Sequence, residues 1–406
     1  MAESDVPPRS FGLRHLAHHL RRRGWPLVVT TVVVASGMAY SLLWGIVVRH
    51  HDYWVYPGDI WGAYRSAHYI GWGALGSVYA AGTGLVTFPG ILVLFTPCAI
   101  LTGHLGMTES FPYYVPHPTS WLVLGPYEML LGCSVLFACD ALAERLGVGR
   151  GRRALLCIAE GVAVWPLLAM WGHPEDAVAT ALAAYALVLA CDNRWTGVGW
   201  LFGAAVVTQP LVLLALPVLL AWGGRERILG LVMRAALPSV GLLAVPLAAE
   251  FHVTVHALVD QPNFPGIDHV TPWTALAPRL GGHGRGTVVA AGPGRLVALV
   301  AASALGWGVR RWRHRPALLV WATAVAMSLR CLTESVMVAF YVWPALALAL
   351  VISAHRGGMR LVLAVLVAAG VTVCAQTRLG EWPWWLMVNG GLLATIAVAL
   401  WPRRSS

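Results

Sequence analysis

The feature that most constrains this chain is a recurring apolar run of about 20 residues, interrupted by short groups of Arg. A run of that length is enough to cross the hydrocarbon core of a bilayer as a helix. Of the 406 residues, 58% are hydrophobic and 11% are charged, whereas soluble domains carry about 25% charged residues. The sequence therefore predicts an all-α, polytopic membrane protein.

The net charge of +10 is best interpreted as a topology signal. The chain has no Lys, and its Arg residues gather in small groups between the apolar runs. Such groups stay on the cytoplasmic side of a membrane, so we expect a lipid bilayer and no nucleic acid as partner. The seven Cys show no metal-binding or disulfide spacing and are expected to be small core residues.

Placing every basic group in the cytoplasm fixes the number of membrane crossings. The groups lie at 21–23, 145–153, 225–227, 310–315, 355–360 and 403–404. All of these groups lie in the cytoplasm under two conditions. The apolar run 84–103 is re-entrant or lies at the outer surface, and about twelve helices cross the membrane. The expected helices lie near 25–48, 119–141, 154–172, 175–192, 195–207, 210–223, 228–248, 293–309, 317–331, 335–354, 360–376 and 382–401. Around Gln209 the two short segments form either a kinked hairpin or one bent element.

This topology divides the chain into a cytoplasmic basic tail, 1–24, and a single transmembrane domain, 25–406. It sends polar segments to one outer face. They are the first outer loop and juxtamembrane or re-entrant region (50–118, with the polar stretch 50–79), residues 172–176, the large loop 250–292 and residues 330–334. Ionisable groups that converge at one membrane depth indicate a functional site. Asp140 and Glu160 lie within or at the end of spans, and the sequence assigns them no partner.

Three groups of motifs occur in a fixed order along these segments. The first comprises Asp59, Tyr64, Ala67, Val78-Tyr79 and Phe88-Pro89-Gly90; the second Gly172-His173-Pro174-Glu175-Asp176, Gly197 to Gly203 and Thr208-Gln209-Pro210; the third Arg330, Glu334 and Phe340-Tyr341-Val342-Trp343-Pro344. In this order the chain resembles the GT-C superfamily of polyprenyl-phosphate-sugar-dependent glycosyltransferases. Within it, the chain is most similar to the actinobacterial polyprenol-phosphate-mannose-dependent mannosyltransferases (glycosyltransferase family 87). It departs from the family at Gly90, where a second Pro is expected, and at Gln209, where the family has Lys.

The resemblance implies a GT-C-like fold with juxtamembrane helices after helix one, and an inverting glycosyltransferase. Such an enzyme moves a sugar from polyprenyl phosphate to a glycolipid or glycan acceptor on the outer face of the plasma membrane. Mannose is the favoured sugar, with arabinofuranose and glucose as alternatives. Asp59 is the expected general base, which takes the proton of the acceptor hydroxyl, and Asp52 is the second choice. Asp59 also suits the N-cap of a short helix, and the two roles are compatible.

The leaving lipid phosphate calls for positive charge, and Arg330 is the first candidate because a guanidinium binds oxyanions through two hydrogen bonds. Arg279 and Arg285 in the large loop are further candidates. The alternative for Arg330 is an i,i+4 pair with Glu334 that neutralises a helix end. Tyr64 joins the candidates through its place in the motif order.

The segment His173, Glu175 and Asp176 is expected to bind the acceptor or to cap a helix. A divalent metal is less favoured, because adjacent positions do not present three ligands on one helix face, and no cofactor is expected. Tyr341 and Trp343 either stack on a sugar or flank the lipid tail, or they belong to an interfacial aromatic belt.

The competing class is a multi-pass transporter or a lipid-linked-sugar flippase, which would use the same charges as a permeation path. That class favours inverted repeats with broken helices, and the two halves show no convincing repeat. A non-catalytic scaffold is a third interpretation, which the convergence of Asp, Glu, Arg and His on one face disfavours.

Overall fold

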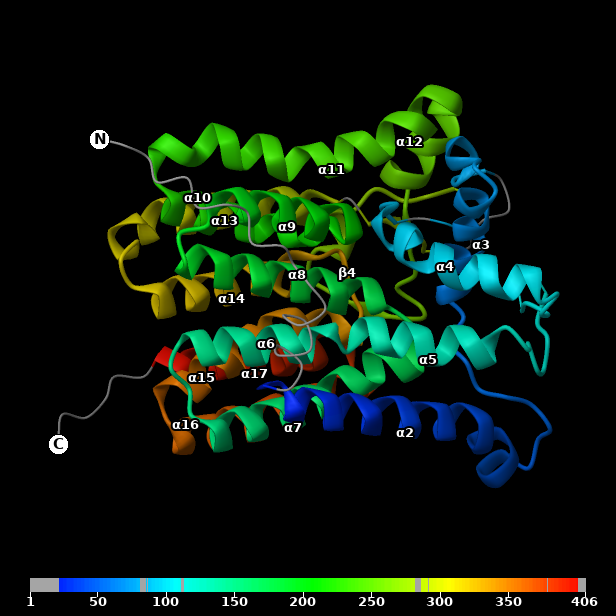
Figure 1. Ribbon diagram of the computed structural model, residues 1–406, viewed down its shortest axis with the longest axis horizontal. Helices are drawn as coiled ribbons and strands as arrows, with labels where there is room; N and C mark the ends of the chain where they lie inside the picture. The colour runs from blue at the N-terminus through cyan, green and yellow to red at the C-terminus, as the bar shows by residue number, and fades with distance from the viewer. Residues whose placement is uncertain are drawn as a thin grey trace.

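The computed structural model describes residues 22–80, 85, 87–110, 113–281, 286–290, 292–377 and 379–400, which are almost entirely helical (Figure 1). The first half contains α2 (Gly24–Arg49), α3 (Ile60–Gly71), η1 (Leu75–Ser77), α4 (Gly90–His104), α5 (Trp121–Gly132), α6 (Ser134–Arg145), α7 (Arg150–Pro166), η2 (Leu167–Trp171), α8 (Pro174–Cys191), α9 (Trp195–Thr208), η3 (Pro210–Ala215) and α10 (Leu216–Gly223). The second half contains η4 (Arg225–Arg227), α11 (Ile228–Ala249), α12 (Phe251–Val259), β1 (Pro262–Asn263), β2 (His269–Val270), η5 (Thr274–Leu276), β3 (Val288–Val289), α13 (Pro293–Val309), η6 (Arg310–Trp312), α14 (Pro316–Thr333), β4 (Val336–Met337), η7 (Ala339–Val342), α15 (Trp343–Arg356), α16 (Gly358–Ala375) and α17 (Glu381–Leu400).

The helices define a multi-pass membrane protein. In the part of the chain that is described, nine helical segments are long and apolar enough to cross a bilayer. Within the described residues, each of the twelve predicted segments is mostly helical, which confirms the all-α fold, although the start of 335–354 forms β4 and α15 begins only at Trp343. Those around α9 and α10 are short, so twelve crossings stay a prediction.

The segments on either side of Gln209 form a hairpin. Gln209 is extended, with φ −147° and ψ 105°, and it separates α9 from the 3-10 turn η3. The rings of Trp195, which begins α9, and Trp222, near the end of α10, lie 6.4 Å apart. The two ends of the segment therefore meet, and the structure selects the hairpin over the bent element.

Close packing in the bundle depends on small residues, as is usual between membrane helices. At Gly203 of α9, an added Cβ would lie 2.7 Å from the carbonyl oxygen of Arg234 in α11. At Gly306 of α13, it would lie 2.6 Å from Pro217 of α10. The centre of the bundle is α15, in which every residue from Trp343 to Ala354 is buried.

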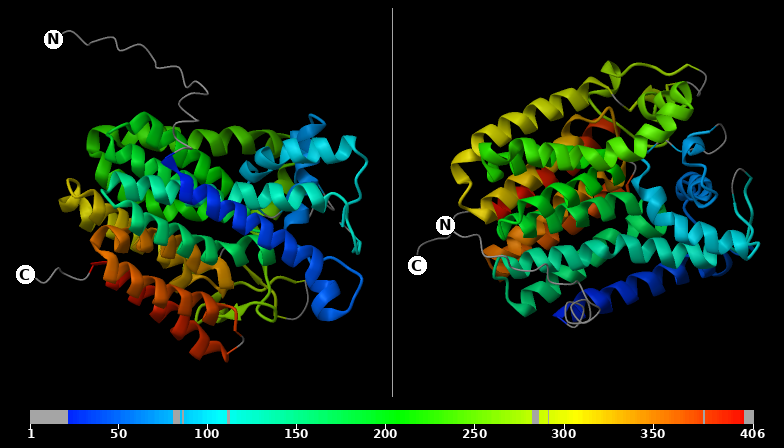
Figure 2. Two further views of the ribbon diagram at one scale, coloured as in Figure 1. Left: turned by 60° about the horizontal axis from the view of Figure 1, so that its bottom comes forward. Right: turned by 45° about the horizontal axis from the view of Figure 1, so that its top comes forward.

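The two ends of the bundle differ in chemistry. The links at 145–150, 223–228, 309–316 and 356–358 carry Arg and lie together at one end (Figure 1), which we call the basic end. Helices α3, α4 and α12 lie at the other end, which we call the loop end, and further views show the same separation (Figure 2).

Helix α4 corresponds to the predicted re-entrant or surface run. It has 15 residues and is therefore about 22 Å long, short of the ~30 Å hydrocarbon core. Its first residue, Gly90, has no room for a Cβ, which would lie 2.6 Å from the carbonyl oxygen of Val207. Helix α4 thus starts against the end of α9 and packs beside α3.

One short strand pair joins the loop 250–292 to the bundle, and another lies within the loop. Strand β1 pairs with β3, and β2 pairs with β4, which follows Glu334. The hydroxyl of Thr271 also donates to the carbonyl oxygens of Glu334 and Ser335, at 2.7 and 3.1 Å. Residues 261–266 include β1 and are therefore held to β3 of the same loop.

A closed ionic square lies nearer the basic end. Arg23 donates to Asp140 and Glu144, each at 2.5 Å, and Arg153 forms ion pairs with the same two carboxylates at 2.8 and 2.9 Å. Arg23 was expected in a basic tail, but it is buried, because it pins the start of α2 to α6 and α7. Asp140 has the partners that the sequence could not assign. Glu160 is buried, and neither of its carboxylate oxygens has a partner among the described residues.

Candidate functional site

The site begins where the juxtamembrane helix α3 meets the N-terminus of α8. Asp59 occupies the N-cap position of α3, but its side chain makes no capping hydrogen bond within the described residues. Instead its Oδ2 lies 3.2 Å from Nε2 of His173, and 66% of the side chain is exposed. The side-chain capping role proposed from the sequence is therefore wrong, and the carboxylate faces the second motif.

His173 links two carboxylates. Its Nδ1 lies 2.6 Å from Oε1 of Glu175, while its Nε2 faces Asp59. The position of the His173 ring is set by the π-helical turn η2 and by Gly172, which has a φ of +66°. At Gly172 an added Cβ would lie 2.6 Å from Cγ of Pro57, so the two segments approach closely.

This arrangement shifts two pKa values in opposite directions. The hydrogen bond from His173 outweighs burial and lowers the pKa of Asp59 below its usual value. Burial acts to lower the pKa of His173, but Glu175 and Asp59 together outweigh it and raise that pKa to about 10. At neutral pH, Asp59 is an ionised carboxylate and His173 an imidazolium that donates to both neighbours.

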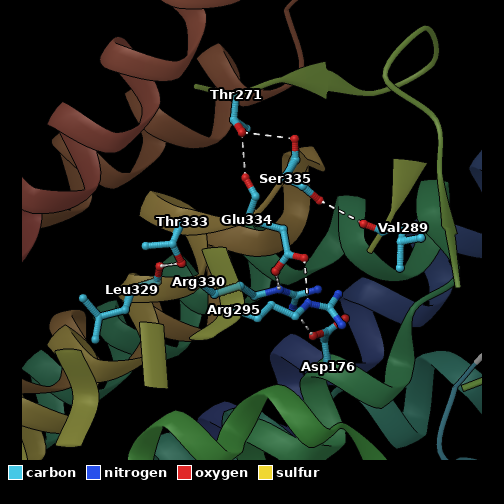
Figure 3. A network of polar contacts seen from close by, with 9 residues as sticks. All are labelled: Asp176, Thr271, Val289, Arg295, Leu329, Arg330, Thr333, Glu334 and Ser335. Carbon is cyan, nitrogen blue, oxygen red and sulfur yellow. Dashed lines mark hydrogen bonds and ion pairs between the residues drawn. The ribbon is translucent and has the colours of Figure 1, made fainter. Parts of the chain in front are cut away.

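Asp176, which follows Glu175 in the sequence, belongs to a second network of ion pairs (Figure 3). Arg330 lies 3.2 Å from Asp176 and 3.9 Å from Glu334, which also accepts from Nε of Arg295 at 2.8 Å. Figure 3 shows both guanidinium groups between the carboxylates of Asp176 and Glu334. Arg330 and both acids are buried, whereas Arg295 exposes 27% of its side chain. The i,i+4 pair Arg330–Glu334 thus exists as one part of a network that joins α8, α13 and α14.

Aromatic rings connect the two parts of the site. Phe340 stacks on His173, with ring centroids 4.4 Å apart, and touches the ring of Tyr341 edge-on. The guanidinium carbon of Arg330 lies 3.3 Å from the centroid of Tyr341, a close cation–π contact. Tyr341 and Trp343 are buried inside the protein, so the interfacial-belt interpretation is wrong for both. One face of Tyr341 is covered by Arg330.

These contacts bring together Asp59, His173, Glu175, Asp176, Arg330, Glu334 and Tyr341, which come from all three motif groups. Sequence reasoning missed Arg295 and Glu128, although each carried a signal. Arg295 is a cation in the first turn of α13, where the helix dipole disfavours it. Glu128 is an acid inside the apolar helix α5, and such residues are rare in spans.

Three other candidates lie apart from this network. Asp52 exposes 92% of its side chain and pairs with His117 at 3.3 Å. Arg279 is exposed, and its backbone bridges to Val288. Tyr64 is buried, and its hydroxyl bonds to Thr102 between α3 and α4, a packing role. Arg285 lies outside the described residues.

The segment 173–176 brings three possible ligand side chains close together. His173 precedes α8, so its ring is not confined to a helix face. One ligand atom each from His173, Glu175 and Asp176 lie within 4.8 Å of one another. The three residues are thus close enough to share an ion.

Comparisons with protein-family models and with curated proteins find no match to this chain. The fold and the site therefore define its class by themselves: an all-α, multi-pass membrane protein with a charged, partly open network where α3, α8, α13 and α14 meet.

Proposed function

We propose that this protein is a membrane glycosyltransferase that moves a sugar from polyprenyl phosphate to an acceptor hydroxyl at the loop end of the bundle. The observation that carries the proposal is the meeting of Asp59 with His173, beside a network that contains Arg330 and Arg295. This transfer needs a base and positive charge beside the leaving phosphate. An exposed carboxylate supplies the first, and a pair of guanidinium groups supplies the second.

Asp59 acts as the general base. Its Oδ2 is held by His173, while two-thirds of the side chain is open to an incoming hydroxyl. The carboxylate takes the acceptor proton as the hydroxyl oxygen attacks the anomeric carbon and the lipid phosphate leaves with the bonding electrons. Attack from the face opposite the phosphate inverts that carbon.

Arg295, which is partly exposed, is a better contact for the leaving phosphate than Arg330, which is buried. Arg330 is engaged by Asp176, Glu334 and the ring of Tyr341. Arg295 contributes Nε to Glu334, and its terminal amino groups make no other ion pair among the described residues. Those groups offer the fork that matches a phosphate.

The basic end of the bundle faces the cytoplasm by the positive-inside rule, so the site works at the outer face of the plasma membrane. Mannose is the proposed sugar, by resemblance alone. The acceptor is a glycolipid or glycan.

The test is a transfer assay in membranes supplied with labelled polyprenyl-phosphate-mannose and extracted acceptor lipids. Wild type transfers label, and Asp59→Asn is expected to lose about 10²- to 10⁴-fold in rate, the usual contribution of a general base. Asp260→Asn is the matched control, because Asp260 forms a similar pair with His256, at 2.7 Å, on α12. Translocation of intact donor without transfer would replace this proposal with the flippase.

A further inference from the structure

The geometry points to a divalent-cation site formed by His173, Glu175 and Asp176, close to the buried carboxylate of Glu128. The class of ligand is a small divalent ion such as Mn²⁺, which accepts carboxylate oxygen together with imidazole nitrogen. Its binding does not depend on the reaction proposed above. Only its role, holding the phosphate of the donor, rests on that function.

The spacing of the first three residues suits one ion. Ligand atoms lie about 2.0–2.6 Å from ions of this kind, so ligands on opposite sides are about 4–5 Å apart. The ligand atoms of His173, Glu175 and Asp176 fall within 4.8 Å of one another. Bonding an ion therefore requires only small movements of the side chains.

Glu128 supplies the second, independent observation. It is completely buried in α5, and both of its carboxylate oxygens lack a hydrogen-bond partner among the described residues. The charged groups that act on it are Glu175 and His173. Burying an unpartnered polar group costs free energy, and a cation held by the nearby Glu175 would offset that cost.

The charges of the network also leave room for a dication. Four carboxylates, from Asp59, Glu175, Asp176 and Glu334, face two guanidinium groups, from Arg295 and Arg330. Acidic side chains thus outnumber guanidinium groups in this network, and a bound cation would reduce the excess of negative charge. Buried charge is stable only when it is compensated.

Asp59 contacts the proposed cation site through the ring of His173. Nδ1 of His173 points to Glu175, and Nε2 points to Asp59. Metal-bound histidines usually donate their other ring N–H to a carboxylate, and loss of that carboxylate typically weakens metal binding 10- to 100-fold. Asp59 would then orient His173 while its other oxygen stays open.

The experiment titrates the purified full-length protein with Mn²⁺ alone, followed by calorimetry and by the electron paramagnetic resonance of bound Mn²⁺. Wild type is expected to bind one Mn²⁺ per chain saturably. Glu175→Gln is expected to weaken binding at least tenfold, and Asp59→Asn about 10-fold. Glu226→Gln, at an exposed pair with Arg227 near the basic end, should bind as wild type does.

Absence of saturable binding to wild type, or unchanged affinity in folded Glu175→Gln, overturns the site. If Glu175→Gln does not fold, Glu128→Gln decides: reduced affinity supports the site, and wild-type affinity contradicts it. Protein that binds Mn²⁺ but transfers no sugar refutes the proposed function while leaving the cation site standing.

Discussion

The two ionic networks of this protein use similar residues in different ways. In the square nearer the basic end, Arg23 and Arg153 each bond both Asp140 and Glu144, so every charge is matched and the ring is closed. In the loop-end network, acids outnumber guanidinium groups, and Asp59 and Arg295 remain partly exposed.

This difference separates a structural role from a functional one. A closed, neutral square holds helices together and offers nothing to a ligand. An open network with unequal charges and exposed ends retains groups that can bind a ligand, and its cost in stability is expected at functional sites. We therefore expect mutations in the square to change folding, and mutations in the loop-end network to change chemistry.

The largest effect on stability is expected for Asp140→Leu. Among the described residues, removing this carboxylate leaves Arg23 and Arg153 with only Glu144, and breaking a buried ion pair costs about 3–5 kcal/mol. Thermal unfolding in detergent measures the loss. Transfer per folded molecule should stay at the wild-type level, and its loss in folded protein would contradict the separation of roles.

Arg295→Gln should weaken donor binding more than it lowers stability, in contrast to Asp140→Leu. Hydrogen bonds to charged groups contribute about 1.5–3 kcal/mol, so the KM for the lipid-linked donor should rise about 10- to 100-fold. Its melting temperature should fall less than that of Asp140→Leu, because Arg295 is partly exposed and Arg330 still faces Glu334. Arg279→Gln, an exposed loop Arg outside the network, is the matched control. Equal effects of the two variants would remove Arg295 from the site.

The smallest effect is expected for Asp52→Asn. Its carboxylate is almost fully exposed and pairs only with His117 among the described residues, and such surface pairs contribute little. Rate and melting temperature should match wild type. A large loss of transfer would instead indicate that Asp52 is the general base and would contradict that role for Asp59.

Hydropathy and basic groups could predict much of the architecture. The spans follow from run length alone, and the shared side of residues 59, 173 and 330 follows from counting crossings. The hairpin at Gln209 could not be chosen in advance, because it depends on contact between Trp195 and Trp222.

Partners far apart in the sequence could not be predicted. Nothing near Asp140 indicates that Arg23, 117 residues earlier, bonds to it. Arg295 likewise becomes a site residue only because α13 brings it to Glu334. The closeness of His173 to Glu175 and Asp176 could not be predicted from their spacing, because His173 stands before α8 and its ring is not confined to a helix face.

The central claim is that Asp59 performs proton transfer in a site that binds the donor through other residues. The most direct test measures donor affinity and turnover together for Asp59→Asn in nanodiscs. We predict, at a saturating concentration of Mn²⁺, a near wild-type Kd for polyprenyl-phosphate-mannose, with kcat lower by about 10²- to 10⁴-fold. Turnover at the wild-type rate would contradict the claim.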